Sequence, residues 1–214
     1  MQARSQRTRR RLVHAGAQTF DRNGFARATL LQIARAAGMT KGALYFHFGS
    51  KDAVAEAVQE QGRALLRDFV QDQWERGVPP VQALIDMTHW LARSLHGDPV
   101  IRASFRITNE FTGRPSPVSD FHQEWITEVL RLTGPALAEG EVLDRGPGDG
   151  PETLLSAAVC GIVTLAGTGM TFPELSRKVG ALWDFLLPAL VPPGHVARYR
   201  TDAPALPGEL AEAA

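Results

Sequence analysis

The stretch TLLQIARAAGMTKGALYFHF, residues 29–48, decides the fold of the first part of the chain. It opens with Thr-x-x-Gln, a capping-box pattern that begins a helix, and that helix can end at Gly38, where glycine tolerates a positive φ. Threonine is a preferred residue type at a helix N-cap, so Thr40 is expected to cap a further short helix that runs to His47. Two short helices joined by a turn of about three residues predict a helix-turn-helix, and the second helix of that motif enters the DNA major groove.

An amphipathic helix is expected before this stretch. Between Ser5 and Asn23 the apolar residues recur at spacings of three and four, while arginines occupy the opposite face. Asn23-Gly24 ends the helix, because glycine readily takes the left-handed conformation that follows a helix C-terminus. At the far end of the motif, we expect Phe46 and Phe48 to be buried and to hold the third helix against the helix that follows it.

Charge is divided unevenly along the chain, although the net charge of the 214 residues is +0. Residues 1–51 carry ten basic side chains against one acidic side chain, Asp21, so their net charge is +9 and that of residues 52–214 is −9. Such a split indicates that the first segment meets a polyanion, and together with a helix-turn-helix it predicts DNA binding. The side chains expected to add salt-dependent affinity rather than specificity are Arg4, Arg7, Arg9, Arg10 and Arg11.

Other features argue against a secreted, membrane or catalytic protein. Cys160 is the single cysteine and cannot form an internal disulfide, and no basic-then-apolar leader opens the chain. No apolar run approaches the roughly 18 residues that a membrane span needs. His89 and His96 have no companions at metal-ligand spacing, and no nucleophile elbow or nucleotide fingerprint is present. We therefore expect a cytoplasmic protein with no metal, no cofactor and no enzymatic activity.

The whole chain is expected to be all-α, with about nine helices, because no alternating strand pattern of useful length occurs. Beyond the first three helices, residues 77–80 break a long helix at 51–76, and the next expected helix carries Leu84 to Leu95 on one stripe and ends near Gly97. The remaining expected helices are 98–111, 119–139, 157–169 and 174–190. Residues 140–151 are rich in Gly and Pro and are expected to form a loop. The last residues, 192–214, contain four prolines and are expected to be mostly disordered.

The segments 152–169 and 174–190 predict a dimer. Both are mostly apolar and lightly charged, so they must be buried on more than one side, and a second subunit can supply the other side. The geometry of DNA also favours a dimer, since two-fold symmetric half-sites about 34 Å apart need two recognition helices. A homodimer with a four-helix interface on palindromic double-stranded DNA is the expected assembly.

The first part of the chain resembles the DNA-binding domain of the tetracycline-repressor (TetR) family of bacterial regulators. The resemblance rests on Gly24-Phe25, Thr29-Leu30, Ile33-Ala34, residues 37–48 and Ser50-Lys51. It implies an all-helical homodimer in which three N-terminal helices bind DNA and about six more form a ligand pocket and a dimer interface. The implied division is a helix-turn-helix domain at 1–51, a ligand-binding and dimerisation domain at 52–191, and the tail at 192–214.

The third helix is expected to present most of the DNA contacts. Thr40 and the free amides at the start of the helix suit a phosphate oxygen, and Lys41 is long enough for a guanine edge or a phosphate. Gly42 and Ala43 leave room for the backbone to approach the bases. The resemblance adds phosphate contacts from Tyr45 and His47. The full expected set is Thr29, Thr40, Lys41, Gly42, Ala43, Tyr45, His47 and Lys51, with Arg9 and Arg10 from the first helix.

Within the family, the sequence is most similar to the γ-butyrolactone autoregulator receptors of antibiotic-producing filamentous bacteria. This resemblance rests on residues 40–48, on residues 97–100 followed by Arg102 and Arg106, and on Trp125. It implies a tryptophan that covers the ring of a small hydrophobic signalling molecule, with polar groups at Gln61 and Thr164. The full expected ligand set is Gln61, Met87, Trp90, Phe105, Trp125, Val129, Val163 and Thr164.

The predicted function is that of a ligand-responsive transcriptional repressor in the cytoplasm, associated with the nucleoid. The expected ligand is an uncharged γ-butyrolactone, butenolide or furan, and the expected targets are antibiotic or other secondary-metabolite genes. Three alternatives stay open. Trp90 and Trp125 can be ordinary core residues. The regulator can respond to an antibiotic or to no ligand, and a helical enzyme with a basic arm is the remaining class.

Overall fold

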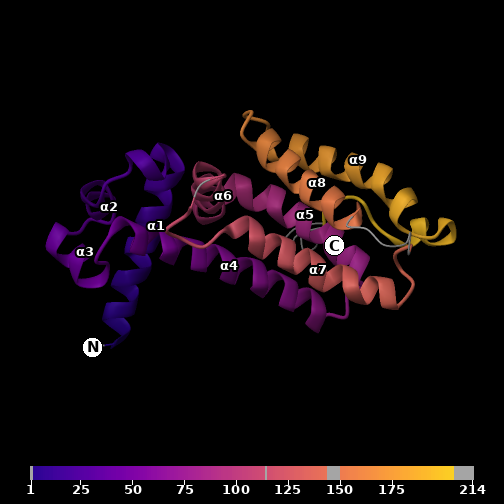
Figure 1. The fold of residues 1–214 in the computed structure, drawn as a ribbon, viewed down its shortest axis with the longest axis horizontal. Helices are drawn as coiled ribbons and strands as arrows, with labels where there is room; N and C mark the ends of the chain where they lie inside the picture. The colour runs from indigo at the N-terminus through magenta and orange to yellow at the C-terminus, as the bar shows by residue number, and fades with distance from the viewer. Residues whose placement is uncertain (1, 114, 144–149, 205–214) are drawn as a thin grey trace, which may run out of the picture. The chain divides into compact units, whose positions relative to one another are not determined.

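The computed structural model describes residues 2–113, 115–143 and 150–204, which form nine α-helices and one 3-10 helix and contain no β-strand (Figure 1). In chain order these are α1 (Gln2–Arg27), α2 (Leu30–Ala36), α3 (Lys41–His47), α4 (Lys51–Glu75), α5 (Pro80–Gly97), α6 (Pro99–Phe111), α7 (Phe121–Ala138), α8 (Gly150–Ala166), α9 (Phe172–Leu190) and η1 (Pro193–Arg198). The expected all-α class is confirmed. Among the described residues, no helix is both long enough and apolar enough to span a membrane.

The helices belong to two compact units, which are described separately. The first unit combines the chain up to Asp68 with Gly97–Trp125. The second combines Phe69–His96 with the described residues from Ile126 onward. The helix-turn-helix and α6 lie in the first unit, and α8 and α9 lie in the second. A functional boundary at residue 51 stays a prediction.

The helix-turn-helix forms as its sequence predicts, and the predicted caps and turn that begin and end its helices are all present. The Thr29 hydroxyl accepts from Gln32 N at 3.2 Å while Gln32 Oε1 accepts from Thr29 N at 2.9 Å, so the capping box that starts α2 is complete. Gly38 has φ 63° in the turn. Thr40 Oγ1 accepts from Ala43 N at 3.1 Å and caps α3.

The first helix, α1, packs against the helix-turn-helix. Gly24 within α1 has φ 76° and a non-helical backbone, so the regular helix ends at the predicted place and a short helical piece follows. The fully buried side chains that join the first helices are Leu12, Phe20, Ile33 and Leu44. Arg11 adds a polar link, since its Nη2 donates to Ala37 O at 2.8 Å at the end of α2.

One expectation about the core of this unit was wrong. Phe48 is buried at 4% exposure, as predicted, but Phe46 is 82% exposed. Leu44 and Phe48 are four residues apart and point to the core together. Phe46 follows Leu44 by two residues, about 200° around a helix, and so it points away from the core. Phe46 and Phe48 are the same residue type, so residue type alone does not predict that only Phe48 faces the core.

The second unit starts its pair of C-terminal helices earlier than expected. Figure 1 shows α8 and α9 side by side. The α8 helix begins at Gly150, seven residues before the expected start at Ala157, while α9 begins at Phe172 after the cap residue Thr171. Of the expected loop at 140–151, residues 144–149 lie outside the described residues. In the same unit, Trp183 Nε1 donates to Thr88 Oγ1 at 2.7 Å and links α9 to α5.

The tail was expected to be disordered from residue 192, and for residues 192–204 this expectation was wrong. They contain η1 and then run along α5. Arg200 Nη2 forms an ion pair with Asp86 Oδ1 at 2.8 Å, and His89 Nε2 contacts Thr201 O at 2.7 Å. These bonds to buried polar groups of α5 order a segment whose composition predicts disorder. The rest of the predicted tail, 205–214, lies outside the described residues.

Candidate DNA interface and effector site

The exposed side of α3 carries the residues expected to read DNA. Lys41, Gly42 and Tyr45 are exposed, whereas Ala43 and His47 are half-buried. The Lys41 ammonium lies 5.5 Å from the centre of the Tyr45 ring, so the cation and the phenol are held on one side of the helix. Phe46 extends this surface, although the sequence pattern suggested a core residue there. The surface offers a charge, a hydroxyl donor and apolar rings to a groove.

The two threonine caps have part of their hydrogen-bonding capacity committed within the motif. Thr40 Oγ1 accepts from Ala43 N, which leaves its hydroxyl proton available to a phosphate oxygen. Thr29 Oγ1 accepts from Gln32 N and also donates to Gln32 Oε1 at 3.1 Å. Both residues are exposed. Thr29 therefore serves the start of α2, and its contact with DNA stays a prediction.

The arginines of α1 form the basic face next to this surface. Arg9 and Arg10 are exposed, and the Arg9 guanidinium lies 5.1 Å from the centre of the Phe48 ring. Stacking of this kind restricts a long side chain without consuming its charge. The face suits a phosphate backbone, with the electrostatic, salt-dependent term that such contacts bring.

Lys51 differs from the expectation because its ammonium is already bonded within the protein. Lys51 Nζ donates to Phe25 O at 2.8 Å and to Ala26 O at 3.3 Å, and it lies 4.3 Å from the centre of the Phe25 ring. A cation on the last carbonyls of a helix stabilises that end. Lys51 thus joins the start of α4 to the end of α1, and its contact with a phosphate stays a prediction.

The end of α1 is also held by α6. Arg102 pairs with Asp21, and Arg106 Nη1 donates to Asp21 O at 2.6 Å. Glu110 accepts from Phe25 N at 2.8 Å through Oε1 and from Ala26 N at 2.9 Å through Oε2. A Cβ atom at Gly24 would meet the Glu110 carboxylate and displace it from its bonds to α1, and the positive φ strains any larger residue here. α6 is therefore bonded directly to the C-terminal part of α1, which packs against the helix-turn-helix.

The expected ligand set is divided between the two units. In the first unit, Phe105 and Trp125 are buried, and Phe105 meets Phe121 edge-on with 5.0 Å between ring centres. Gln61 of the same unit is exposed and lines a groove of about 480 Å³ beside Arg9 and Arg10. The structure therefore buries both aromatic members of this unit, and it places Gln61 on the outer face of α4.

The remaining expected ligand residues lie in the second unit. Met87 and Val129 are buried, and Val163 is half-buried. Trp90 is half-buried and stacks on Phe69 with 5.4 Å between ring centres. Thr164 is exposed, and its hydroxyl donates to Cys160 O at 2.8 Å. The roles of these side chains toward a ligand stay predictions.

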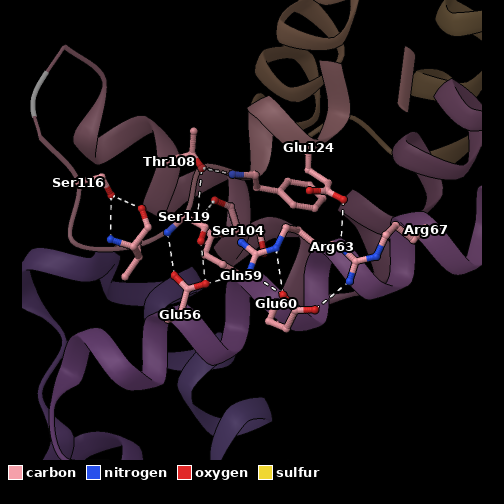
Figure 2. A network of polar contacts seen from close by, with 12 residues as sticks. Glu56, Gln59, Glu60, Arg63, Arg67, Ser104, Thr108, Ser116, Ser119 and Glu124 are labelled. Carbon is pink, nitrogen blue, oxygen red and sulfur yellow. Dashed lines mark hydrogen bonds and ion pairs between the residues drawn. The ribbon is translucent and has the colours of Figure 1, made fainter. Parts of the chain in front are cut away.

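Sequence reasoning missed a polar network in the first unit, which Figure 2 shows where α4 meets α6 and the start of α7. The ion pairs within it are Arg63 with Glu56 (2.8 Å) and Glu60 (2.6 Å), and Arg67 with Glu60 (2.8 Å) and Glu124 (3.0 Å). Hydrogen bonds from Arg63 lower the pKa of Glu60 despite the opposing effect of burial. Spacings of three and seven along α4 indicate such pairs in advance, but the partner on α7 has no signal in the sequence.

Within this network, Glu56 also binds Ser119, which lies in the segment before α7. Ser119 donates to Glu56 twice, from N to Oε2 at 2.7 Å and from its hydroxyl to Oε1 at 2.8 Å. Partial burial of Glu56 favours the neutral acid, but the bonds from Arg63 and Ser119 outweigh it and lower the pKa of Glu56. Glu56 is therefore the anion that fixes the start of α7 to α4.

An apolar groove runs along α8 and α9 in the second unit. Its volume is about 530 Å³. The residues that line it include Ala157, Gly161, Ile162, Leu165, Val179 and Phe185. Phe185 is 84% exposed, which is unusual for a large aromatic side chain. Exposed apolar grooves of this kind are typical of protein–protein and ligand-binding sites.

Comparisons with known proteins agree with this geometry. Residues 12–58 match the family described as bacterial regulatory proteins, tetR family. The chain is 32% identical to the A-factor receptor protein of Streptomyces griseus over 203 residues, which is 94% of this chain and 70% of that protein. A crystal structure of a γ-butyrolactone receptor, an ArpA-like protein, is 31% identical, with a TM-score of 0.75 over 92% of this chain and 95% of that one. CprB of Streptomyces coelicolor in complex with its operator sequence is 30% identical, with a TM-score of 0.76 and the same coverage of both chains.

Proposed function

Because this chain belongs to the TetR family of bacterial regulatory proteins, we propose that it is a repressor that binds a palindromic operator as a homodimer and leaves it when a small molecule binds. The observation that carries the proposal is the exposed face of α3, where Lys41 and Tyr45 stand beside Phe46 next to the basic face of α1. A rigid helix with uncommitted polar and apolar side chains suits the major groove. The structure of the relative CprB in complex with its operator sequence supports this placement.

The dimer forms through the groove along α8 and α9. The partner that fits an apolar groove with a protruding phenylalanine is a second copy of the same surface, since a two-fold interface brings each surface onto itself. Small side chains at Ala157 and Gly161 leave room for the Phe185 ring of the other copy. Two copies give two recognition helices, as a palindromic operator requires.

The ligand is a neutral γ-butyrolactone, butenolide or furan signal that controls antibiotic or other secondary-metabolite genes. Support comes from the relatives, which are named as receptors for A-factor and for γ-butyrolactone. The aromatic pair of Phe105 and Phe121 and the buried Trp125 supply an apolar surface for a ring or an acyl chain.

Release follows from the bonds between α6 and α1. A ligand that enters beside α4 and displaces α6 pulls on Asp21 through Arg102 and on the end of α1 through Glu110. The recognition helices then leave the spacing that the operator requires. Such coupling between two sites typically amounts to about 1 to 3 kcal/mol.

The test is a footprint of purified protein on promoter DNA from antibiotic gene clusters, repeated in the presence of synthetic γ-butyrolactones and furans. We expect protection of a two-fold symmetric site and its loss when an active compound is added. Protection of no promoter at any protein concentration contradicts the repressor assignment.

A regulator that answers to an antibiotic, or to no ligand, is the second candidate. The observation in its favour is the packing of the expected ligand residues, since Met87, Trp125 and Val129 are all buried as core residues are. Thermal melting separates the candidates, because a ligand at 100 times its dissociation constant adds about 2.7 kcal/mol to the free energy of unfolding. Stabilisation by lactones alone supports the first candidate, and stabilisation by antibiotics alone supports the second.

A further inference from the structure

Three buried polar atoms at the contact of α4 with α6 have no hydrogen-bond partner: Gln59 Oε1, Ser104 Oγ and Arg63 Nη1. Gln59 and Ser104 are both 0% exposed. The orientation of the Gln59 amide is fixed, because its Nε2 donates to Ser104 O at 3.3 Å and to Thr108 Oγ1 at 3.4 Å. The amide oxygen is therefore the group left over, and a buried polar group without a partner is rare and costly.

The three atoms belong to one place in the fold. Gln59, Gly62 and Arg63 are three and four residues apart and share one face of α4. A Cβ atom at Gly62 would lie 2.5 Å from Ser104 Oγ, so the serine hydroxyl rests against the backbone of α4. Figure 2 shows Gln59, Arg63 and Ser104 together within the polar network.

We infer that Gln59, Arg63 and Ser104 form the hydrogen-bonding end of the effector site, an inference that rests on the proposed function. The amide oxygen of Gln59 only accepts and the guanidinium of Arg63 only donates, while the Ser104 hydroxyl can do both. The complementary ligand therefore carries a hydroxyl group close to a carbonyl. Each of its polar atoms then satisfies a buried protein atom that otherwise has no partner.

The charges around this cluster select a neutral ligand. Two cations, Arg63 and Arg67, share three carboxylates, those of Glu56, Glu60 and Glu124. The positive charge of Arg63 is therefore already balanced, and an anionic ligand would meet excess negative charge in a buried site. A carbonyl oxygen can use the free Nη1 hydrogen without that cost.

The apolar part of the ligand has a place next to the polar cluster. Thr108 Oγ1 also accepts from Phe121 N at 3.1 Å, and the Phe121 ring meets Phe105 edge-on. Trp125 lies one turn further along α7 and is fully buried. Ser104 and Phe105 are adjacent on α6, so a ligand that reaches the cluster must separate α6 from α4. That separation is the displacement that reaches α1 through Arg102.

A matched pair of compounds tests the inference: a γ-butyrolactone with an acyl chain and one free hydroxyl group, and its O-methyl ether. Calorimetry with the full-length dimer gives the ratio of their affinities. We expect the wild type to bind the hydroxyl compound about tenfold to a hundredfold more tightly, because the ether leaves a buried acceptor unpaired. Gln59→Leu and Ser104→Ala bring this ratio close to one. Gln71→Leu, an exposed position on α4, keeps the wild-type ratio.

Each outcome supports or overturns the inference. If Gln59→Leu does not fold, Ser104→Ala decides, because its hydroxyl makes no hydrogen bond and its removal leaves the packing intact. Variants that keep the wild-type ratio and change only the melting temperature show that the cluster holds structural water, which overturns the inference. Loss of the ratio in Gln61→Leu alone also overturns it. A wild type that is released from DNA by both compounds equally overturns this inference but not the proposed function, whereas release by neither compound contradicts both.

Discussion

Arg102 on α6 forms an ion pair with Asp21 on α1, with 2.8 Å between Nε and Oδ2. The neighbouring Arg106 bonds to Asp21 O, and Glu110 bonds to the last turn of α1, so one face of a single helix holds the C-terminal part of the helix that supports the helix-turn-helix. α6 also contributes Ser104 and Phe105 to the proposed effector site. The same helix thus joins the proposed ligand surface to the helix that supports the proposed DNA surface, within one unit of the fold.

Arg102→Gln is expected to weaken the response to ligand without preventing DNA binding. Both side chains of the pair are partly exposed, so its loss costs only about 0 to 1 kcal/mol of stability. The measurement is the ratio of operator affinities with and without an active lactone, which we expect to fall severalfold. Arg76→Gln is the control, because its ion pair with Asp72 joins the turn directly after α4 to the last part of α4 and does not involve α1 or α6. An unchanged ratio in Arg102→Gln refutes the role of this link.

Lys41→Ala and Tyr45→Ala are each expected to abolish specific operator binding and to leave a folded dimer. Both side chains are exposed on α3, so their removal does not disturb the core. A footprint and a sedimentation measurement on the same preparations check the two parts of this prediction. Where a lost contact was to a phosphate, the slope of log affinity against log salt falls by about one. Footprints like those of the wild type mean that α3 does not read the operator.

Phe185→Glu is expected to convert the dimer into monomers. The substitution places a charge in an apolar interface, where no partner compensates it. Sedimentation at micromolar concentration measures the result, and operator affinity should fall with it because one recognition helix reads only half a site. Arg177→Ala is the control, since this exposed residue of α9 does not line the groove. A Phe185→Glu protein that stays dimeric places the interface elsewhere.

Stability should depend on pH through His89. Its burial lowers the pKa, although Thr201 O, Asp86 and Asp202 favour the cation and Arg200 opposes it. Because the folded-state pKa lies below the unfolded value, the unfolded chain binds more protons in between, and stability rises with pH through that interval. The stabilisation is complete above the unfolded pKa of about 6.5 and is lost as the pH falls toward the folded value. Unfolding free energies of wild type and His89→Gln between pH 5 and 8 measure this, and equal slopes contradict it.

Local signals let the sequence predict the DNA-binding half closely. Caps at Thr29 and Thr40 and the turn at Gly38 depend on neighbours within a few residues, and all three form as expected. Burial is harder, because Phe46 and Phe48 have the same residue type and differ only in the direction that helix geometry gives them. The start of α8 was misplaced for a similar reason, since Gly150 and Pro151 suit a loop and a helix N-terminus equally well.

The proposed effector site depends on contacts between distant residues, and these have no local signal in the sequence. Nothing in the order of residues indicates that Ser104 lies against Gly62, or that Glu110 accepts from the backbone near Gly24. The tail is a further example, because Arg200 finds Asp86 more than a hundred residues earlier. A resemblance therefore suggests the class of ligand, and only the fold indicates which polar atoms are left for it to bind.

The most direct test of the account is a linked titration of ligand and operator. Ligand affinity is measured by calorimetry with the free dimer and again with the dimer saturated by operator DNA. Thermodynamic reciprocity requires that DNA weaken ligand binding by the same factor by which ligand weakens DNA binding, about 5-fold to 150-fold for typical coupling. The proposed coupling between ligand and operator predicts this equal reduction in both directions. Equal ligand affinity with and without operator would contradict it.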